Sequence, residues 1–144
     1  MDYYDSLVVD SNIVISGLIR DGKTRELLID SPFLLYAPET MTGEIRKYED
    51  IIIEKSGLTK DEFEMLFGML TEDITIVEKE KYKNYMEEAD RLIGHIDKKD
   101  VPFIALALYL PNSGIWSNDG DFEEQDRVGI LKTEEVLKLF EKGN

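Results

Sequence analysis

The sequence predicts an α/β fold with a central, mostly parallel sheet of four to five strands. Short apolar runs typical of buried strands alternate with longer amphipathic stretches typical of helices. Of the 144 residues, 42% are hydrophobic, which is enough for a core and argues against disorder. No repeat, low-complexity tract or linker divides the chain, so residues 1–144 are expected to form a single domain.

The first half of the chain predicts two strands and three helices. Two short apolar runs are typical of buried strands, and apolar residues at helical spacing favour the helices. Thr24 is a candidate cap of the second helix, Pro38 fits the first turn of the third, and Gly57 is expected to stop it. The predicted elements are a strand at 7–9, a helix at 13–19, a helix at 24–29, a strand at 33–36 and a helix from Pro38 through Ile52.

The second half continues the alternation of helix and strand. Thr59 followed by Glu62 is typical of a capping box, which predicts a helix start at this position. Pro102 is tolerated in the first turn of a very apolar helix, and Thr133 is expected to cap the last one. The predicted elements are a helix from Thr59 through Leu70, a strand at 74–77, a helix at 80–93, a buried helix at 100–110, a strand at 115–117, a turn at 118–121, an edge strand at 128–131 and a helix from Thr133 to Phe140.

The composition excludes several classes of function. Seventeen Lys and Arg against 31 Asp and Glu give a net charge of −14, which argues against a broad basic face for nucleic acid. The absence of cysteine excludes disulfides, thiolate zinc sites and cysteine nucleophiles. A single histidine excludes a multi-histidine metal site and disfavours a Ser-His-Asp triad.

The sequence shows no sign of a membrane span or a signal peptide. No apolar run approaches the ~20 residues that cross a bilayer. The N-terminal segment Met1-Asp2-Tyr3-Tyr4-Asp5 has no positive charge before its apolar stretch. We therefore expect a cytoplasmic protein that does not bind membranes.

Several acidic residues stand apart from the charged helix faces. Asp10 directly ends the first strand, and Asp119 and Asp121 follow the strand at 115–117. Each has a structural alternative, because Asp10 and Asp100 could cap helices, Asp119 and Asp121 fit an ordinary turn, and Glu44 could be an exposed helix residue. Together, these acids can reach the same edge of a parallel sheet: Asp10, Glu44, Asp97, Asp100, Asp119 and Asp121.

Carboxylates that converge in this way repel one another unless they are protonated or neutralised. A bound divalent cation solves this problem, and ligands that are all oxygen favour Mg²⁺ or Mn²⁺ over zinc. Such a cluster can hold one ion, or two ions ~3.5–4 Å apart as in enzymes that cleave phosphodiesters. The acids therefore predict a site for Mg²⁺ or Mn²⁺.

Three segments in order resemble the motifs of PIN-domain nucleases. The run Val8-Val9-Asp10-Ser11-Asn12-Ile13 resembles the opening motif, an apolar strand followed by Asp, a small polar residue and Asn. The segment from Asp97 to Leu108 resembles the central motif, an Asp before a buried, alanine-rich helix. The segment from Ile115 to Phe122 resembles the closing motif, a strand followed by Asp-x-Asp-Phe. The resemblance covers nearly the whole chain.

The resemblance assigns roles to individual residues. Asp10, Glu44, Asp100 and Asp119 resemble the four catalytic and metal-binding acids of the family, and Asp121 resembles an accessory metal ligand. The weaker candidates for substrate contact or for supporting the acids are Ser11, Asn12, Asp97, Lys98 and Lys99. For the two lysines, ordinary solvated side chains are the alternative. No acid of the motif set is missing.

The resemblance implies a three-layer α/β/α sandwich and an endoribonuclease that cleaves single-stranded RNA with Mg²⁺ or Mn²⁺. It also implies a homodimer and either the toxin half of a toxin–antitoxin pair, with an antitoxin or other protein partner, or an RNA-processing enzyme. The helices at 59–73 and 80–93 could offer a partner groove, although their apolar residues are also typical of core. The high negative charge is consistent with a site that works on a transient substrate or under a basic partner.

Other functions remain open at this point. The main alternative is a non-catalytic PIN-like scaffold or binding module in an RNA-related assembly, against which the complete acid set weighs. A phosphatase of the haloacid dehalogenase type would use Asp10 as nucleophile, but it usually needs Asp where Asn12 stands. No glycine-rich phosphate loop follows the first strand, and the acids are not arranged as in response regulators.

The aromatic residues and the single histidine carry weaker signals. Trp116 could stack on a base, but its place in an apolar strand favours core packing. Tyr3, Tyr4 and Phe122 are expected to be more exposed candidates for base stacking. His95 is expected to be a surface or packing residue.

Overall fold

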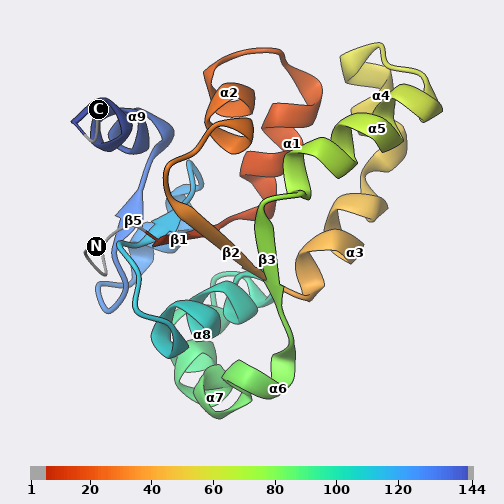
Figure 1. The fold of residues 1–144 in the computed structure, drawn as a ribbon. Coiled ribbons are helices and arrows are strands. Elements are labelled where there is room, and N and C mark those ends of the chain that lie inside the picture. The colour runs from red at the N-terminus through yellow and green to blue at the C-terminus, as the bar shows by residue number, and fades with distance from the viewer. Residues whose placement is uncertain (1–5, 143–144) are drawn as a thin grey trace.

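The computed structural model describes residues 6–142, without the side chain of residue 142, and contains a five-stranded sheet whose paired strands are all parallel. The strands are β1 (Ser6–Val9), β2 (Leu34–Pro38), β3 (Ile74–Val77), β4 (Ile115–Trp116) and β5 (Ile130–Leu131). Their order across the sheet is β3-β2-β1-β4-β5 (Figure 1). The predicted α/β class and the short fifth strand at the edge of the sheet are confirmed.

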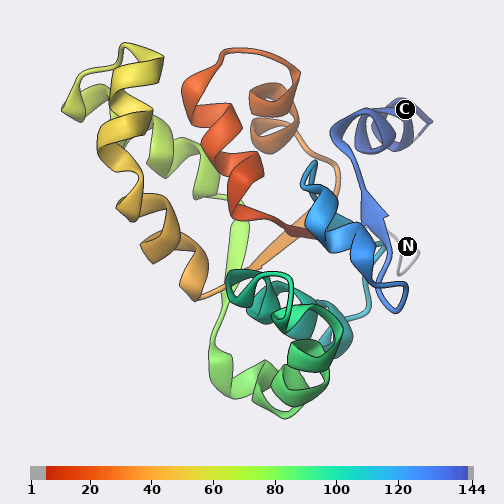
Figure 2. The same cartoon turned by 180° about the vertical axis from the view of Figure 1, so that it is seen from behind.

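Helices lie on both sides of the sheet and give the three expected layers (Figures 1 and 2). One side carries α1 (Ser11–Ile19), α2 (Lys23–Ile29), α3 (Thr40–Lys47), α4 (Glu49–Ser56) and α5 (Lys60–Thr71). The other side carries α6 (Lys79–Tyr82), α7 (Met86–Ala89) and α8 (Val101–Tyr109). The last helix, α9 (Thr133–Lys142), packs beside β5.

The core is built around β1 and α8. All four residues of β1 are buried, as expected for the central strand of a sheet that is covered on both faces. Most of α8 is also buried, which confirms the expectation of a helix that packs on most of its sides. Trp116 is fully buried in β4 and donates its Nε1–H to Thr133 Oγ1 at 3.0 Å. Its role in core packing is confirmed.

The predicted helix from Pro38 through Ile52 is wrong in two respects. Pro38 ends β2 and does not begin a helix. It lies beyond the last residue that β2 pairs with β1, where a missing N–H is tolerated. The helix is also split at Tyr48, which adopts φ −104° and ψ 11° between α3 and α4. Gly57 does stop the second piece, with a φ of 75° in the left-handed region that favours glycine.

The predicted helix at 80–93 is also divided. It consists of α6, a 3₁₀ turn at Lys83–Tyr85, α7 and a π-helical turn at Asp90–Gly94. The mixed turns still bury Tyr82, Ala89 and Ile93, which is why the apolar spacing resembled that of one helix. A Cβ at Gly94 would lie 2.0 Å from Asp90 Oδ1, so a larger residue there would require the exposed Asp90 side chain to move.

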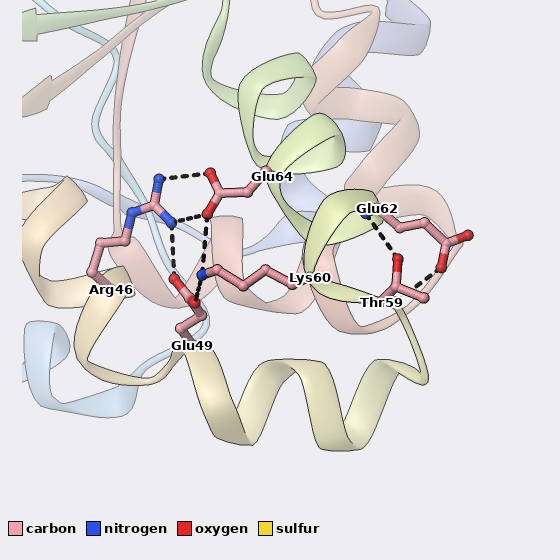
Figure 3. A network of polar contacts seen from close by, with 6 residues as sticks. All are labelled: Arg46, Glu49, Thr59, Lys60, Glu62 and Glu64. Atoms are coloured by element: carbon pink, nitrogen blue, oxygen red, sulfur yellow. Dashed lines mark hydrogen bonds and ion pairs between the residues drawn. The ribbon is translucent and has the colours of Figure 1, made fainter.

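Three threonines were expected to cap helices, and the structure confirms this for Thr59. The Thr59 hydroxyl accepts the N–H of Glu62 at 3.1 Å, and Glu62 accepts the N–H of Thr59 at 2.9 Å (Figure 3). Thr24 is not a cap, because α2 begins at Lys23 after an extended Gly22. Thr133 is the first residue of α9 itself, and its hydroxyl accepts hydrogen bonds from Trp116 and Asn118.

Among residues 6–142, no helix has both the length and the apolar character that crossing a bilayer would need.

Candidate metal centre

Asp10 lies at the point where β1 ends and α1 begins, next to the end of β4. Its backbone N–H donates to the Trp116 carbonyl at 3.0 Å, which continues the pairing of the two strands. The side chain is only 3% exposed, and its Oδ2 accepts a hydrogen bond from Ser117 Oγ at 2.8 Å. Asp10 occupies the N-cap position of α1 but makes no side-chain cap bond. The backbone N–H of Asn12 in α1 nevertheless lowers the pKa of this carboxylate, so a weak capping interaction remains beside the Ser117 bond.

Ser117 joins two of the predicted acids. Besides donating to Asp10, its Oγ accepts the N–H of Asp119 at 2.9 Å. Sequence reasoning gave Ser117 no role in the site. A detectable signal was present, because a polar residue directly after a short apolar strand, two positions before an acid, lies at the same sheet edge as Asp10.

Glu44 is brought to the site by α3. Ser11, the buried first residue of α1, donates its hydroxyl to Glu44 Oε1 at 3.0 Å. Ser11 therefore contacts an acid, which is compatible with the supporting role that was one of the two open to it. Glu44 is half-buried, so the alternative of an ordinary exposed helix residue is wrong.

Asp100 is the most unusual acid of the site. It is 6% exposed, and its buried Oδ2 has no hydrogen-bond partner within the described part of the chain. It occupies the N-cap position of α8 without making a side-chain cap bond. A buried polar atom without a partner is costly, so capping does not explain this residue.

Two other acids make capping bonds in turns, which for Asp119 is the ordinary turn given as its structural alternative. Asp119 Oδ1 accepts the N–H of Asp121 at 3.0 Å, which caps the 3₁₀ turn at Gly120–Glu124. Asp97 Oδ1 accepts the N–H of Lys99 at 3.0 Å and caps the turn at Lys98–Asp100. In each case only one carboxylate oxygen makes this bond, so the other can still serve as a ligand.

Three carboxylates form the tightest group. Asp97, Asp100 and Asp121 each offer an oxygen within 4.8 Å of the other two. Asp97 was a weaker candidate, as an extra carboxylate or a substrate or supporting residue, and the structure places it in this group. A neighbouring cavity of ≈ 330 Å³ is lined by Asn12, Glu44, Asp97, Asp100 and Asp119, among others. The predicted acids from four separate segments are thus brought to one region at the carboxyl ends of the strands.

The electrostatics of the cluster favour the protonated form of its acids. Burial raises the pKa of Asp10 to about 6, against the lowering effect of the Ser117 hydrogen bond. Burial, followed by the charge of Asp97, raises the pKa of Asp100 to about 8. The pKa of Glu44 is raised by burial, and that of Asp121 chiefly by the charge of Asp119. A cation that binds here would replace these protons.

The two lysines of the central motif are exposed, which fits both a contact with substrate and an ordinary solvated side chain. Lys98 Nζ bonds Asp90 Oδ1 at 3.0 Å, and Lys99 Nζ donates to the Tyr48 hydroxyl at 3.4 Å. His95 is exposed, as expected of a surface residue. Phe122 is fully buried against Phe103, so the expectation that it is exposed for base stacking is wrong. Tyr3 and Tyr4 lie outside the described residues.

The fold and the cluster define an α/β protein with a candidate acidic metal centre at one edge of a parallel sheet. A family model of the PIN domain matches residues 8–138, which include all three motifs and every predicted acid. The chain therefore belongs to the PIN domain family, whose members are typically metal-dependent nucleases. No curated protein matches the chain.

Proposed function

We propose that this protein is an endoribonuclease that cleaves single-stranded RNA with Mg²⁺ or Mn²⁺. The observation that carries the proposal is the Asp100 carboxylate, which is buried without a partner for Oδ2 beside Asp97 and Asp121. Burying like charges together lowers stability unless something neutralises them. The donors are all oxygens, which fits a hard divalent cation and does not fit zinc.

The residues divide into ligands and supporting groups. The acids that would hold one or two ions are Asp10, Glu44, Asp97, Asp100, Asp119 and Asp121. Ser117 orients Asp10, and Ser11 orients Glu44, each through one hydrogen bond. Bound metal would polarise the scissile phosphate and lower the pKa of a water. The chain's own part is to hold the carboxylates in place and to present the cavity to the strand.

The proposal extends to partners. A homodimer, or an antitoxin-like protein that binds this chain, would follow from the family resemblance. Met65 is 70% exposed and Met69 49% exposed on α5, which leaves apolar surface for such contacts. Sedimentation of the purified chain tests the homodimer, since a monomer at micromolar concentration would contradict it.

Cleavage of a panel of end-labelled, single-stranded RNAs tests the function. Wild type is compared in Mn²⁺, in Mg²⁺ and in EDTA, beside Asp10→Asn, Asp100→Asn and the control Asp61→Asn, which changes an exposed acid on α5. We expect cleavage in metal that EDTA abolishes, that both site variants lose and that the control keeps. Full activity of either site variant would contradict the ligand assignment. Absence of both cleavage and Mn²⁺ binding in wild type would favour the non-catalytic scaffold.

A further inference from the structure

The ≈ 330 Å³ cavity beside the acids has a second wall without acidic residues. Tyr48, Ile51, Ile52 and Lys55 line it, from α4 and the residue that precedes α4. Positions three, four and seven residues apart share one face of a helix, so these side chains form a continuous stripe. This wall therefore adds an aromatic ring, two isoleucines and a lysine to the carboxylates of the cavity.

Tyr48 lies at the break between α3 and α4. Its φ of −104° and ψ of 11° turn the chain here. Arg46 and Glu49, on either side of the break, are joined by a hydrogen bond of 2.8 Å (Figure 3). Arg46 and Glu49 are tied further to Glu64 and Lys60 of α5. These ion pairs thus stabilise the change of direction between α3 and α4 at Tyr48.

The Tyr48 ring is accessible. Tyr48 is 36% exposed to solvent. Lys99 Nζ is 3.4 Å from the hydroxyl and 5.9 Å from the ring centroid. These two distances differ by nearly the distance from the ring centroid to the hydroxyl oxygen. The Lys99 ammonium therefore lies beyond the hydroxyl end of Tyr48 and does not cover a face of the ring.

Positive charge gathers around this ring although the chain as a whole is acidic. An adjoining cavity of ≈ 450 Å³ shares Glu44 and Lys99 with the first, and Lys47 and Lys98 also line it. Lys55 lies at the far end of the Tyr48 stripe. Lysines on both sides of Tyr48 are suited to the phosphates of a strand that passes the acids.

We propose that Tyr48 is a substrate-binding residue, on which the base of a nucleotide next to the scissile phosphate stacks. The inference rests on the proposed function, because it places that base beside the metal centre. Stacking needs an unpaired base and accepts any base, since each has a π face. The contact therefore selects single-stranded RNA over duplex, with little preference for sequence.

Steady-state cleavage of one short RNA in Mn²⁺ tests the proposal with matched variants. Tyr48→Leu removes the ring, Tyr48→Phe keeps it, and Tyr85→Leu removes a ring of similar exposure, 37%, in the 3₁₀ turn between α6 and α7. We expect Tyr48→Leu to raise KM about tenfold with kcat within about twofold, and the other two variants to stay within about twofold of wild type. Circular dichroism verifies that Tyr48→Leu is folded.

An abasic scan of the same RNA identifies the base. Removing one particular base should raise the KM of wild type about tenfold and leave that of Tyr48→Leu unchanged, because the stacking partner is already absent. If the two losses add, or if Tyr48→Leu has the KM of wild type, the inference is overturned while the nuclease assignment stands. If wild type does not cleave any RNA, both are overturned.

Discussion

Two groups of charged residues in this protein are built on opposite principles. On the surface, Arg46 and Lys60 alternate with Glu49 and Glu64 in a network across α3, α4 and α5 (Figure 3). At the edge of the sheet, Asp97, Asp100 and Asp121 each offer an oxygen within 4.8 Å of the other two. The first group pairs opposite charges in water, and the second crowds like charges in a partly buried site.

The pKa values move in opposite directions in the two groups. Hydrogen bonds from Lys60 and Arg46 lower the pKa of Glu49, and Arg46 lowers that of Glu64. Burial raises the pKa of Asp10 and of Asp100. The network is consistent with stabilisation of the fold, whereas the cluster opposes folding. A group of residues that lowers stability is a functional-site candidate, because stability cannot account for its presence.

The largest effect is expected from Asp100→Asn, which should change activity and stability in opposite directions. Loss of this ligand should lower Mn²⁺-dependent cleavage more than about 100-fold, since even changes to groups behind a ligand cost about 10–100-fold. Without metal, the variant should unfold at a higher temperature than wild type at pH 8, because a buried like charge is gone. Cleavage assays in Mn²⁺ measure the change in activity, and thermal unfolding in EDTA measures the change in stability. A lower unfolding temperature in EDTA would show that Asp100 serves the fold.

The pH dependence of metal-free stability is the next largest effect. Burial raises the pKa values of Asp10 and Asp100 to about 6 and about 8 in the folded protein, from an ordinary value of 3.8. Between about pH 4 and 8 the folded state therefore binds more protons than the unfolded state, so stability falls as pH rises. From pH 5.5 to 8.5, we expect the free energy of unfolding to fall by at least about 1.4 kcal/mol, the equivalent of one pKa unit.

Denaturant unfolding in EDTA across this range measures the pH effect. Asp100→Asn should show a smaller decrease, because one of the two titrating groups is removed. Saturating Mn²⁺ should remove most of the decrease in unfolding free energy of wild type, because the ion binds the ionised carboxylates. Stability that rises with pH over this interval would contradict the electrostatic description of the cluster.

Ser117→Ala should have a smaller effect on the site than loss of a ligand. It removes the hydroxyl that donates to Asp10 and that accepts the N–H of Asp119. We expect Mn²⁺ affinity to fall about 10–100-fold, as for other groups that orient ligands. Ser6→Ala is the matched control, because Ser6 is also buried and donates one hydrogen bond, to the Pro111 carbonyl at 2.9 Å. Equal losses of affinity in both variants would mean that Ser117 acts only through stability.

The smallest effect is expected in the surface network. Glu64→Gln removes the carboxylate that contacts Arg46 and Lys60. Exposed ion pairs contribute little and are screened by salt, so the unfolding temperature should change less than in Ser6→Ala, and less again in 1 M salt. Mn²⁺ affinity, measured by titration calorimetry, should remain that of wild type. A loss of affinity would show that the network and the cluster are coupled.

The fold and the acids were predictable from the sequence because both depend on local patterns. Buried strands read as apolar runs, and Asp10 was recognisable because it follows one directly. The split at Tyr48 was not predictable, because apolar spacing continues across it and the bracing partners Lys60 and Glu64 come from another helix. Phe122 was expected to be exposed, but it is buried against Phe103, and a contact between residues distant in sequence leaves no local pattern.

The central claim is that the buried acids bind a divalent cation, and calorimetric titration of Mn²⁺ at pH 7 tests it most directly. Titrations in two buffers of different ionisation enthalpy count the protons released. Because Asp100 has a pKa of about 8, we predict that wild type binds Mn²⁺ with release of up to about one proton, and that Asp100→Asn binds far more weakly with less release. Equal Mn²⁺ affinity and equal proton release in the two proteins would contradict the account.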